Sequence, residues 1–206
     1  MGLLGKIFGN TRKPEGFFGK LMVSGMNGGS HAAMAEWGLS DFPLDENINA
    51  LDIGCGGGAN IARLLAKCKT VTGVDYSTVS VAKSSKVNAK AIAEGRCKVQ
   101  EANVAALPFD EESFDAVTAF ETIYFWPDIE NSFRGVLRVL KPGGRFLIVN
   151  ESDENDPSGQ KWEKIIEGMH VYSADELVSH LTHAGFSSVN VERESSKHWL
   201  KVTALK

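Results

Sequence analysis

Apolar and polar positions alternate along this chain in a way that predicts strands and helices in regular succession. A compact apolar run at 49–53, a run dominated by β-branched residues at 70–74, and three further segments at 97–101, 114–120 and 145–149 are predicted to be strands. Apolar residues at helical spacing, with capping and stop residues, predict helices over 31–37, 59–67, 78–94, 129–140, 162–166 and 174–184. Two more strand-like runs, 188–193 and 198–204, close the chain.

This succession predicts an α/β fold with a seven-stranded, mostly parallel sheet. Strands that alternate with helices pair in parallel through crossovers, which place helices on both faces of the sheet. The connection between the last two strands is too short for a crossover, so these strands are expected to form a C-terminal antiparallel hairpin.

Residues 1–46 and 47–206 are expected to play different parts within one compact domain. The first segment is rich in glycine and carries apolar side chains such as Phe17 and Trp37, with Ser30 as the expected cap of its helix. Such a segment cannot fold alone, and the free place for it is across the carboxyl ends of the strands. We therefore predict that it is a lid that contacts substrate, over a cofactor-binding domain at 47–206.

Composition narrows the classes of function. The chain has 206 residues, 43% hydrophobic and 23% charged, with a net charge of -4. Its basic residues are dispersed, which disfavours nucleic acid as a partner, and no apolar run is long enough to insert stably in a membrane. The three cysteines contain no CxxC pair, so we expect no disulfide framework, no metal site and a cytoplasmic location.

The strongest local motif lies where the first strand meets the first helix. Gly54, Gly56, Gly57 and Gly58 follow this strand, and glycines there let the backbone turn sharply and approach a ligand. The spacing also fits a dinucleotide fingerprint. Asp75, at the end of the second strand, can accept both hydroxyls of a ribose, which either class of cofactor offers.

Three features separate these alternatives. Asp52 lies two residues before Gly54, where a carboxylate would repel a pyrophosphate but attract an ammonium group. The second feature is the motif Leu107-Pro108-Phe109 followed by Phe114-Asp115-Ala116-Val117, which recurs in methyltransferases. The third feature, Val139-Leu140-Lys141-Pro142-Gly143-Gly144, recurs in them likewise. With these motifs in this order, residues 47–204 resemble the class I S-adenosylmethionine (SAM)-dependent methyltransferases, in particular the type 11 group, with a Rossmann-like sheet.

The resemblance implies a set of cofactor-binding residues. Gly54, Gly56 and Gly58 would line the methionine and ribose, with Asp52 near the methionyl amine and Asp75 on the ribose. Tyr76 would flank the adenine, Val104 would donate its backbone N–H to the ring, and Phe120 and Glu121 would lie beside the methyl group. Asn103 stands where relatives usually carry Asp; its amide oxygen can accept the same hydrogen bond without charge.

The sequence gives less information about the residues that bind the methyl acceptor. Residues 20–37 are faintly similar to the lead-in of quinone-biosynthesis C-methyltransferases, which implies that Met26, Asn27 and His31 contact substrate. Tyr124, Phe125 and Trp126 are expected to wall its pocket, although aromatic clusters are often plain packing. Candidate catalytic residues are Glu121, His31 and His170, and each can equally be a solvated side chain.

The expected reaction is transfer of the SAM methyl group to an O, N, C or S nucleophile of a small molecule. One alternative is a protein that binds SAM or its demethylated product, S-adenosylhomocysteine (SAH), without methyl transfer. A second is an NAD(P)-dependent reductase, although no Tyr-x-x-x-Lys pair is present.

Overall fold

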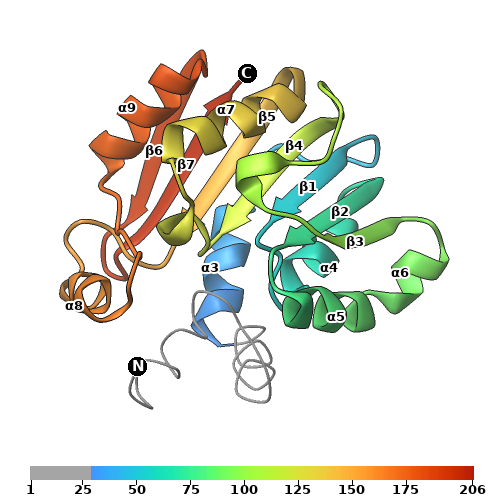
Figure 1. The fold of residues 1–206 in the computed structure, drawn as a ribbon, viewed down its shortest axis with the longest axis horizontal. Coiled ribbons are helices and arrows are strands. Elements are labelled where there is room, and N and C mark those ends of the chain that lie inside the picture. Colours follow the sequence, from blue (N-terminus) through green and yellow to red (C-terminus); the bar gives the residue numbers. More distant parts are fainter. Residues whose placement is uncertain (1–28) are drawn as a thin grey trace.

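A seven-stranded sheet forms the centre of the part of the chain that this computed structural model describes, residues 29–206 (Figure 1). Its strands are β1 (Asn49–Ile53), β2 (Thr70–Asp75), β3 (Cys97–Glu101), β4 (Phe114–Phe120), β5 (Leu140–Asn150), β6 (Ser188–Glu194) and β7 (Trp199–Leu205). Their spatial order is β3-β2-β1-β4-β5-β7-β6. Strands β1 to β5 pair in parallel, and β7 is antiparallel to both β5 and β6. The predicted mostly parallel sheet with a C-terminal antiparallel hairpin is confirmed.

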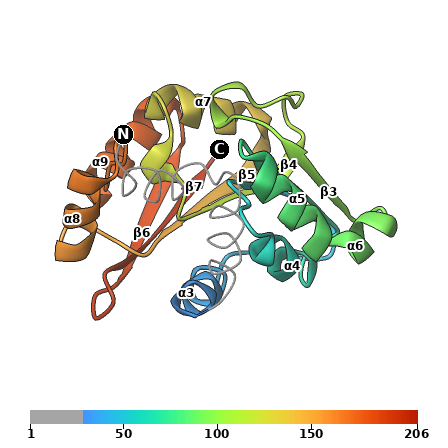
Figure 2. The ribbon, with the colours of Figure 1, turned by 60° about the horizontal axis from the view of Figure 1, so that its bottom comes forward.

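Helices cover both faces of this sheet, as predicted. The helices are α3 (Ser30–Gly38), α4 (Ala59–Leu65), α5 (Thr78–Val87), α6 (Ala89–Ala93), α7 (Ile129–Val139), α8 (Pro157–Ile165) and α9 (Ala174–Ala184), with short 3-10 turns η1 (Val104–Ala106) and η2 (Ile123–Phe125). Figure 2 shows α3 and α4 on one side of the sheet and α7 and α9 on the other.

Alternate residues of the central strands build two apolar layers. On β5, Phe146 and Ile148 pack in the layer that includes side chains of α7 and α9. Leu147 and Val149 pack in the opposite layer, with side chains of α3 and α4. A strand buried on both faces in this way is typical of a parallel sheet between helices.

Helix α3 is the described part of the predicted lid segment. It packs on the sheet through Met34 and through Gly38, where an added Cβ would lie 2.5 Å from Cγ2 of Val149. Gly29, rather than the predicted Ser30, precedes the helix as its N-cap, so the helix begins one residue earlier than expected. The lid prediction for residues 14–37 and the predicted substrate contacts Met26 and Asn27 fall largely or wholly outside the described residues and remain predictions.

Some predicted boundaries differ from the observed ones. The helix expected over 78–94 is broken at Asn88 into α5 and α6. Strand β5 begins at Leu140 rather than at Arg145, and its pairing with β4 is irregular between Phe114 and Ala116. This irregularity accommodates the Lys-Pro-Gly-Gly stretch, in which Gly143 has a φ of 76°.

Capping residues fix the ends of the later helices. The Asp156 side chain accepts hydrogen bonds from the backbone of Ser158 and Gly159, which starts α8 earlier than the predicted 162–166. The predicted α9 is confirmed, with a capping box between Ser173 and Glu176 and with Gly185 in the left-handed region at its end.

Within residues 29–206, no helix is both long and apolar enough to cross a bilayer.

Candidate active site

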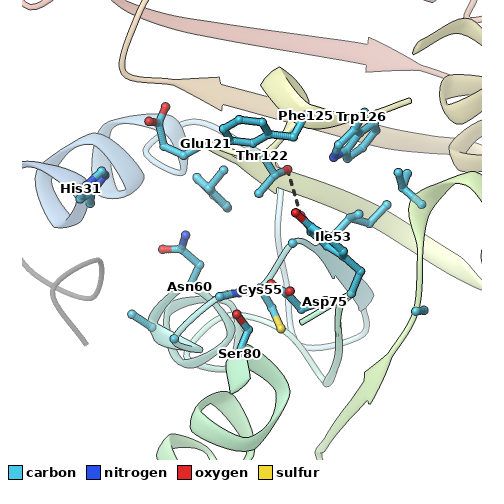
Figure 3. Close-up of a pocket in the computed structure, with 18 of the residues that line it drawn as sticks. His31, Ile53, Cys55, Asn60, Asp75, Ser80, Glu121, Thr122, Phe125 and Trp126 are labelled. Atoms are coloured by element: carbon cyan, nitrogen blue, oxygen red, sulfur yellow. Dashed lines mark hydrogen bonds between the residues drawn. The ribbon is translucent and has the colours of Figure 1, made fainter. Parts of the chain in front are cut away.

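A cavity of about 240 Å³ opens at the carboxyl ends of β1, β2 and β4, next to the point where the strand order reverses. This is where ligands bind in open α/β sheets. Figure 3 shows its walls, with His31 from α3 on one side and Asp75 and Ser80 on another. Ten residues named from the sequence line it: His31, Gly54, Gly56, Asp75, Tyr76, Asn103, Val104, Phe120, Glu121 and Trp126. Asp52, Gly58, Tyr124 and His170 do not line it.

The glycine loop is shaped by steric demands at its two ends. Gly54 has a φ of 75°, and an added Cβ would lie 2.3 Å from Cγ2 of Thr122. Gly58 has a φ of 82°, and an added Cβ would lie 2.5 Å from Oγ of Ser84. The Asn88 side chain donates to the carbonyl of Gly58 at 3.0 Å, which ties the loop to the end of α5. Only glycine therefore fits at either end of the loop, because a side chain would collide with Thr122 at Gly54 and with Ser84 at Gly58.

Asp75 joins the end of β2 to the glycine loop. Its Oδ2 accepts from the backbone N–H of Gly56 at 3.0 Å, and its Oδ1 accepts from that of Ser77 at 2.8 Å. Burial raises the pKa of Asp75, and these two hydrogen bonds oppose that shift. The carboxylate thus lies in the cavity wall with its oxygens oriented, as expected for a residue that contacts a ligand.

Asp52 lies inside β1 and is buried beneath the cavity. Its Oδ1 accepts from the Thr118 hydroxyl at 2.8 Å, while its buried Oδ2 has no hydrogen-bond partner among the described residues. Burial raises the pKa of Asp52 to about 7; the Thr118 hydrogen bond opposes this shift and the charge of Asp75 adds to it. An unpaired buried carboxylate oxygen next to a ligand cavity calls for a donor that the described chain does not supply.

Asn103 and Val104 form another part of the cavity wall. The Asn103 side chain accepts from the backbone N–H of Ala105 at 3.0 Å and caps the turn η1. Val104 is the first residue of that turn and is buried. The amide oxygen of Asn103 therefore already supports the local backbone.

Glu121 comes directly after β4 and has a φ of 60°, in the left-handed region that non-glycine residues rarely adopt. Its Oε1 accepts from the Tyr124 hydroxyl at 3.0 Å and from the backbone N–H of Glu151. The Tyr124 oxygen in turn accepts from the backbone N–H of Ser152 at 3.2 Å. Burial raises the pKa of Glu121 to about 8; the hydrogen bond from Glu151 opposes this shift and the charge of Glu151 adds to it.

The predicted acceptor-side residues fall into two groups. His31 and Trp126 line the cavity, and Nδ1 of His31 lies 3.6 Å from Oε2 of Glu151. Tyr124 lies outside the cavity wall and holds Glu121 in place. His170 is also outside it, with Nδ1 2.6 Å from Oε1 of Glu163. Of the three candidate catalytic residues, His31 and Glu121 are brought together and His170 is not.

Other residues of the site had no counterpart in the sequence-based prediction. Asn60, Arg63 and Thr122 line the cavity, and Phe125, which also lines it, was expected in the pocket wall together with Tyr124 and Trp126. Glu151 comes directly after β5, just as Glu121 comes directly after β4. The rule that the carboxyl ends of parallel strands carry the ligand site would have found Glu151 from the predicted end of the fifth strand.

These features define a class of protein. A glycine loop after β1, an acidic residue at the end of β2 and a cavity at the strand-order reversal form the site of a nucleoside-type cofactor on an α/β sheet. A model of a methyltransferase domain matches residues 51–148. A crystal structure of a SAM-dependent methyltransferase from Aquifex aeolicus superposes with a TM-score of 0.76 at 19% identity, covering 90% of this chain and 97% of that one.

Sequence relatives agree with this class. A 27-O-demethylrifamycin SV methyltransferase from Amycolatopsis mediterranei is 32% identical over 170 residues, 78% of this chain and 62% of that protein. Squalene methyltransferase 1 from Botryococcus braunii is 31% identical over 152 residues, 70% of this chain and 40% of that protein. Residues 51–148 therefore match the methyltransferase-domain family, on a sheet with the fold of SAM-dependent methyltransferases. The chain spans less than two thirds of the length of either relative.

Proposed function

We propose that this protein transfers the methyl group of SAM to a nucleophilic atom of a small molecule bound between the glycine loop, α3 and η2. The observation that carries the proposal is the cavity, which has the glycine loop and Asp75 at one end and His31, Glu121 and Phe125 at the other. The relatives named above, an O-methyltransferase and a squalene methyltransferase, support a small-molecule acceptor.

The residues present fit SAM at the donor end. Asp75 is oriented to accept the ribose hydroxyls, and the wall at Asn103 and Val104 suits the adenine. The unpaired Oδ2 of Asp52, buried behind the cavity wall, suits the methionyl ammonium through water. Arg63, whose guanidinium donates to Oδ1 of Asn60 at 3.1 Å, is the cation of the cavity wall and suits the methionyl carboxylate.

SAM supplies a methyl group on a positively charged sulfur, and that charge disappears as the methyl group leaves. The chain's part is then to hold the acceptor in line and to exclude water, which alone can account for much of the acceleration. Phe125 and Trp126 give the acceptor end an apolar wall. Glu121, with a pKa of about 8, is placed to take a proton from an acceptor that must lose one.

Location and partners are proposed on the same basis. The three cysteines, Cys55, Cys68 and Cys97, are all buried free thiols, which supports a reducing compartment and hence the cytoplasm. The dispersed basic residues and the net charge of -4 support a partner other than nucleic acid.

The proposal is tested by calorimetry with SAM and SAH on the wild type and on Asp75→Asn. We expect both ligands to bind, NADH not to bind, and Asp75→Asn to weaken SAM by about 1–3 kcal/mol because charged hydrogen bonds to the ribose are lost. Asp115→Asn is the matched control. Asp115 also accepts from a backbone N–H, that of Asn49 at 2.9 Å, but lies at the start of β4, the opposite end from the cavity.

The outcomes separate the alternatives. SAM binding without formation of SAH across a panel of phenols, amines and isoprenoid alcohols would leave a SAM-binding protein without methyl transfer. NADH binding in place of SAM would refute the proposal. An unchanged SAM affinity in Asp75→Asn would remove Asp75 from the site.

A further inference from the structure

Three side chains from distant parts of the sequence converge at the acceptor end of the cavity. His31 comes from α3, Glu121 follows β4 and Glu151 follows β5. One ligand atom from each, an imidazole nitrogen and two carboxylate oxygens, lies within 4.8 Å of the others. The sequence predicted no metal site, because these residues share no local motif.

The two carboxylates are held side by side by the fold. The backbone N–H of Glu151 and the Tyr124 hydroxyl both donate to Oε1 of Glu121, so this carboxylate has a set position. No hydrogen bond within residues 29–206 engages its Oε2. Glu151 contacts only His31 among the basic side chains of that part of the chain. In residues 29–206, neither carboxylate has a lysine or arginine within ion-pair distance.

Among residues 29–206, no lysine or arginine compensates the charge of this pair. A cation placed between two carboxylates this close favours the ionised form of both. An octahedral ion with bonds of about 2.1 Å holds its ligand atoms about 3 to 4.2 Å apart. The 3.6 Å between Nδ1 of His31 and Oε2 of Glu151 falls in this range, so only a small movement is needed to bind an ion.

We propose that His31, Glu121 and Glu151 bind one divalent cation of the Mn²⁺ type, whose remaining coordination positions face the cavity and take an oxygen of the acceptor. Imidazole with carboxylates suits such ions, and three protein ligands leave positions for water or substrate. His31 and Glu121 both line the cavity, so an ion held by them contacts whatever lies next to the methyl donor. The ion would favour the deprotonated form of a hydroxyl acceptor. The role of the acceptor oxygen rests on the proposed methyl transfer, whereas the metal site does not.

The chain offers a matched pair for the test. Nδ1 of His183 lies 3.6 Å from Oε1 of Glu130, the same separation as between His31 and Glu151. This pair lies between α9 and α7, and only one carboxylate takes part in it. His31→Ala and Glu151→Gln remove half-exposed side chains from the proposed site, and His183→Ala removes the equivalent histidine elsewhere.

Mn²⁺ binding to the full chain is measured by the loss of the free-ion electron paramagnetic resonance signal, together with water-proton relaxation. We expect one ion per chain and an enhanced relaxation rate, because water occupies the open positions. His31→Ala and Glu151→Gln should each weaken Mn²⁺ at least about tenfold, since even outer partners of a metal site cost that much. His183→Ala should bind as the wild type does.

No binding at millimolar Mn²⁺, or equal binding in all four proteins, would overturn the site and leave a His–Glu ion pair only. Binding without relaxation enhancement would overturn the open positions and hence the acceptor role. SAM calorimetry on the same samples, without metal, reports separately on the proposed function.

Discussion

The buried carboxylate of Asp52 gives a quantitative test of the site through the pH dependence of stability. Its pKa is raised from 3.8 to about 7, chiefly by burial in β1. A group whose pKa is raised on folding binds its proton more tightly in the folded state. The stability that this contributes is complete below pH 3.8 and is lost as the pH rises through 7. The total shift of about 3 units corresponds to about 4 kcal/mol.

Part of this loss falls above pH 5.5, where Glu121 also titrates, but the contribution of Glu121 is common to the wild type and Asp52→Asn and cancels in their difference. Between pH 5.5 and 9 the contribution of Asp52 falls by about 2 kcal/mol, by integration of the two pKa values. Asp52→Asn is neutral at every pH and removes this loss. The unfolding free energy of the variant should therefore rise by about 2 kcal/mol relative to the wild type over this range.

The assay is urea unfolding of both proteins without SAM at intervals of half a pH unit. Asp115→Asn is again the matched control. Hydrogen bonding to Lys141 and Asn49 outweighs partial burial and lowers the pKa of Asp115, so the difference between this variant and the wild type should stay flat above pH 5.5. A constant difference between Asp52→Asn and the wild type would refute the reasoning, because Asp52 would then be ionised throughout.

Two further predictions concern the cofactor end. Gly54→Ala should destabilise the fold by at least about 1–2 kcal/mol and abolish SAM binding, since φ is positive and the new methyl group meets Thr122. Thr122→Gly in the same chain removes both Cγ2 and the Cβ that lies 2.7 Å from the added carbon, so it should restore part of the unfolding free energy, measured by urea titration, and no restoration would exclude this clash as the cause. Asn103→Asp should bind SAM as tightly as the wild type or more tightly in calorimetry, since a charged acceptor replaces a neutral one. Weaker binding would mean that the amide is required at the turn with Ala105.

The sheet could be predicted from the sequence because the central strands β1, β4 and β5 carry apolar runs and most of the connections between parallel strands contain a helix with capping or stop residues. The prediction was wrong where a local signal has two meanings. The Lys-Pro-Gly-Gly stretch was taken as a break between helix and strand, but it begins β5 with a distorted pairing. Asn88, which ends α5, could not be recognised, because its amide donates to Gly58, thirty residues away in the sequence.

The cofactor end of the site was predicted more fully than the acceptor end, and the reason is physical. Gly54 and Gly58 are required by the backbone itself, so residue type and spacing reveal them. At the acceptor end, the register of β4 against β5 pairs Phe120 with Val149, and the chain beyond each strand then brings Glu121 and Glu151 together. No short sequence motif shows that these two glutamates are neighbours. A glutamate after a strand is common and does not by itself indicate a ligand site.

This difference also indicates which part of the site determines specificity for the methyl acceptor. The donor end depends on backbone conformation, which tolerates few substitutions, as the positive φ and close neighbours of Gly54 and Gly58 show. The acceptor end depends on side chains from α3, η2 and the residues after β4 and β5, which can change without disturbing the sheet. His31 and Glu151 are half-exposed and take no part in either apolar layer, so replacing them costs the fold little. Glu151 thus lies beside Glu121 at a position that the fold leaves open to substitution, so a change at Glu151 can alter what the acceptor end binds without disturbing the sheet.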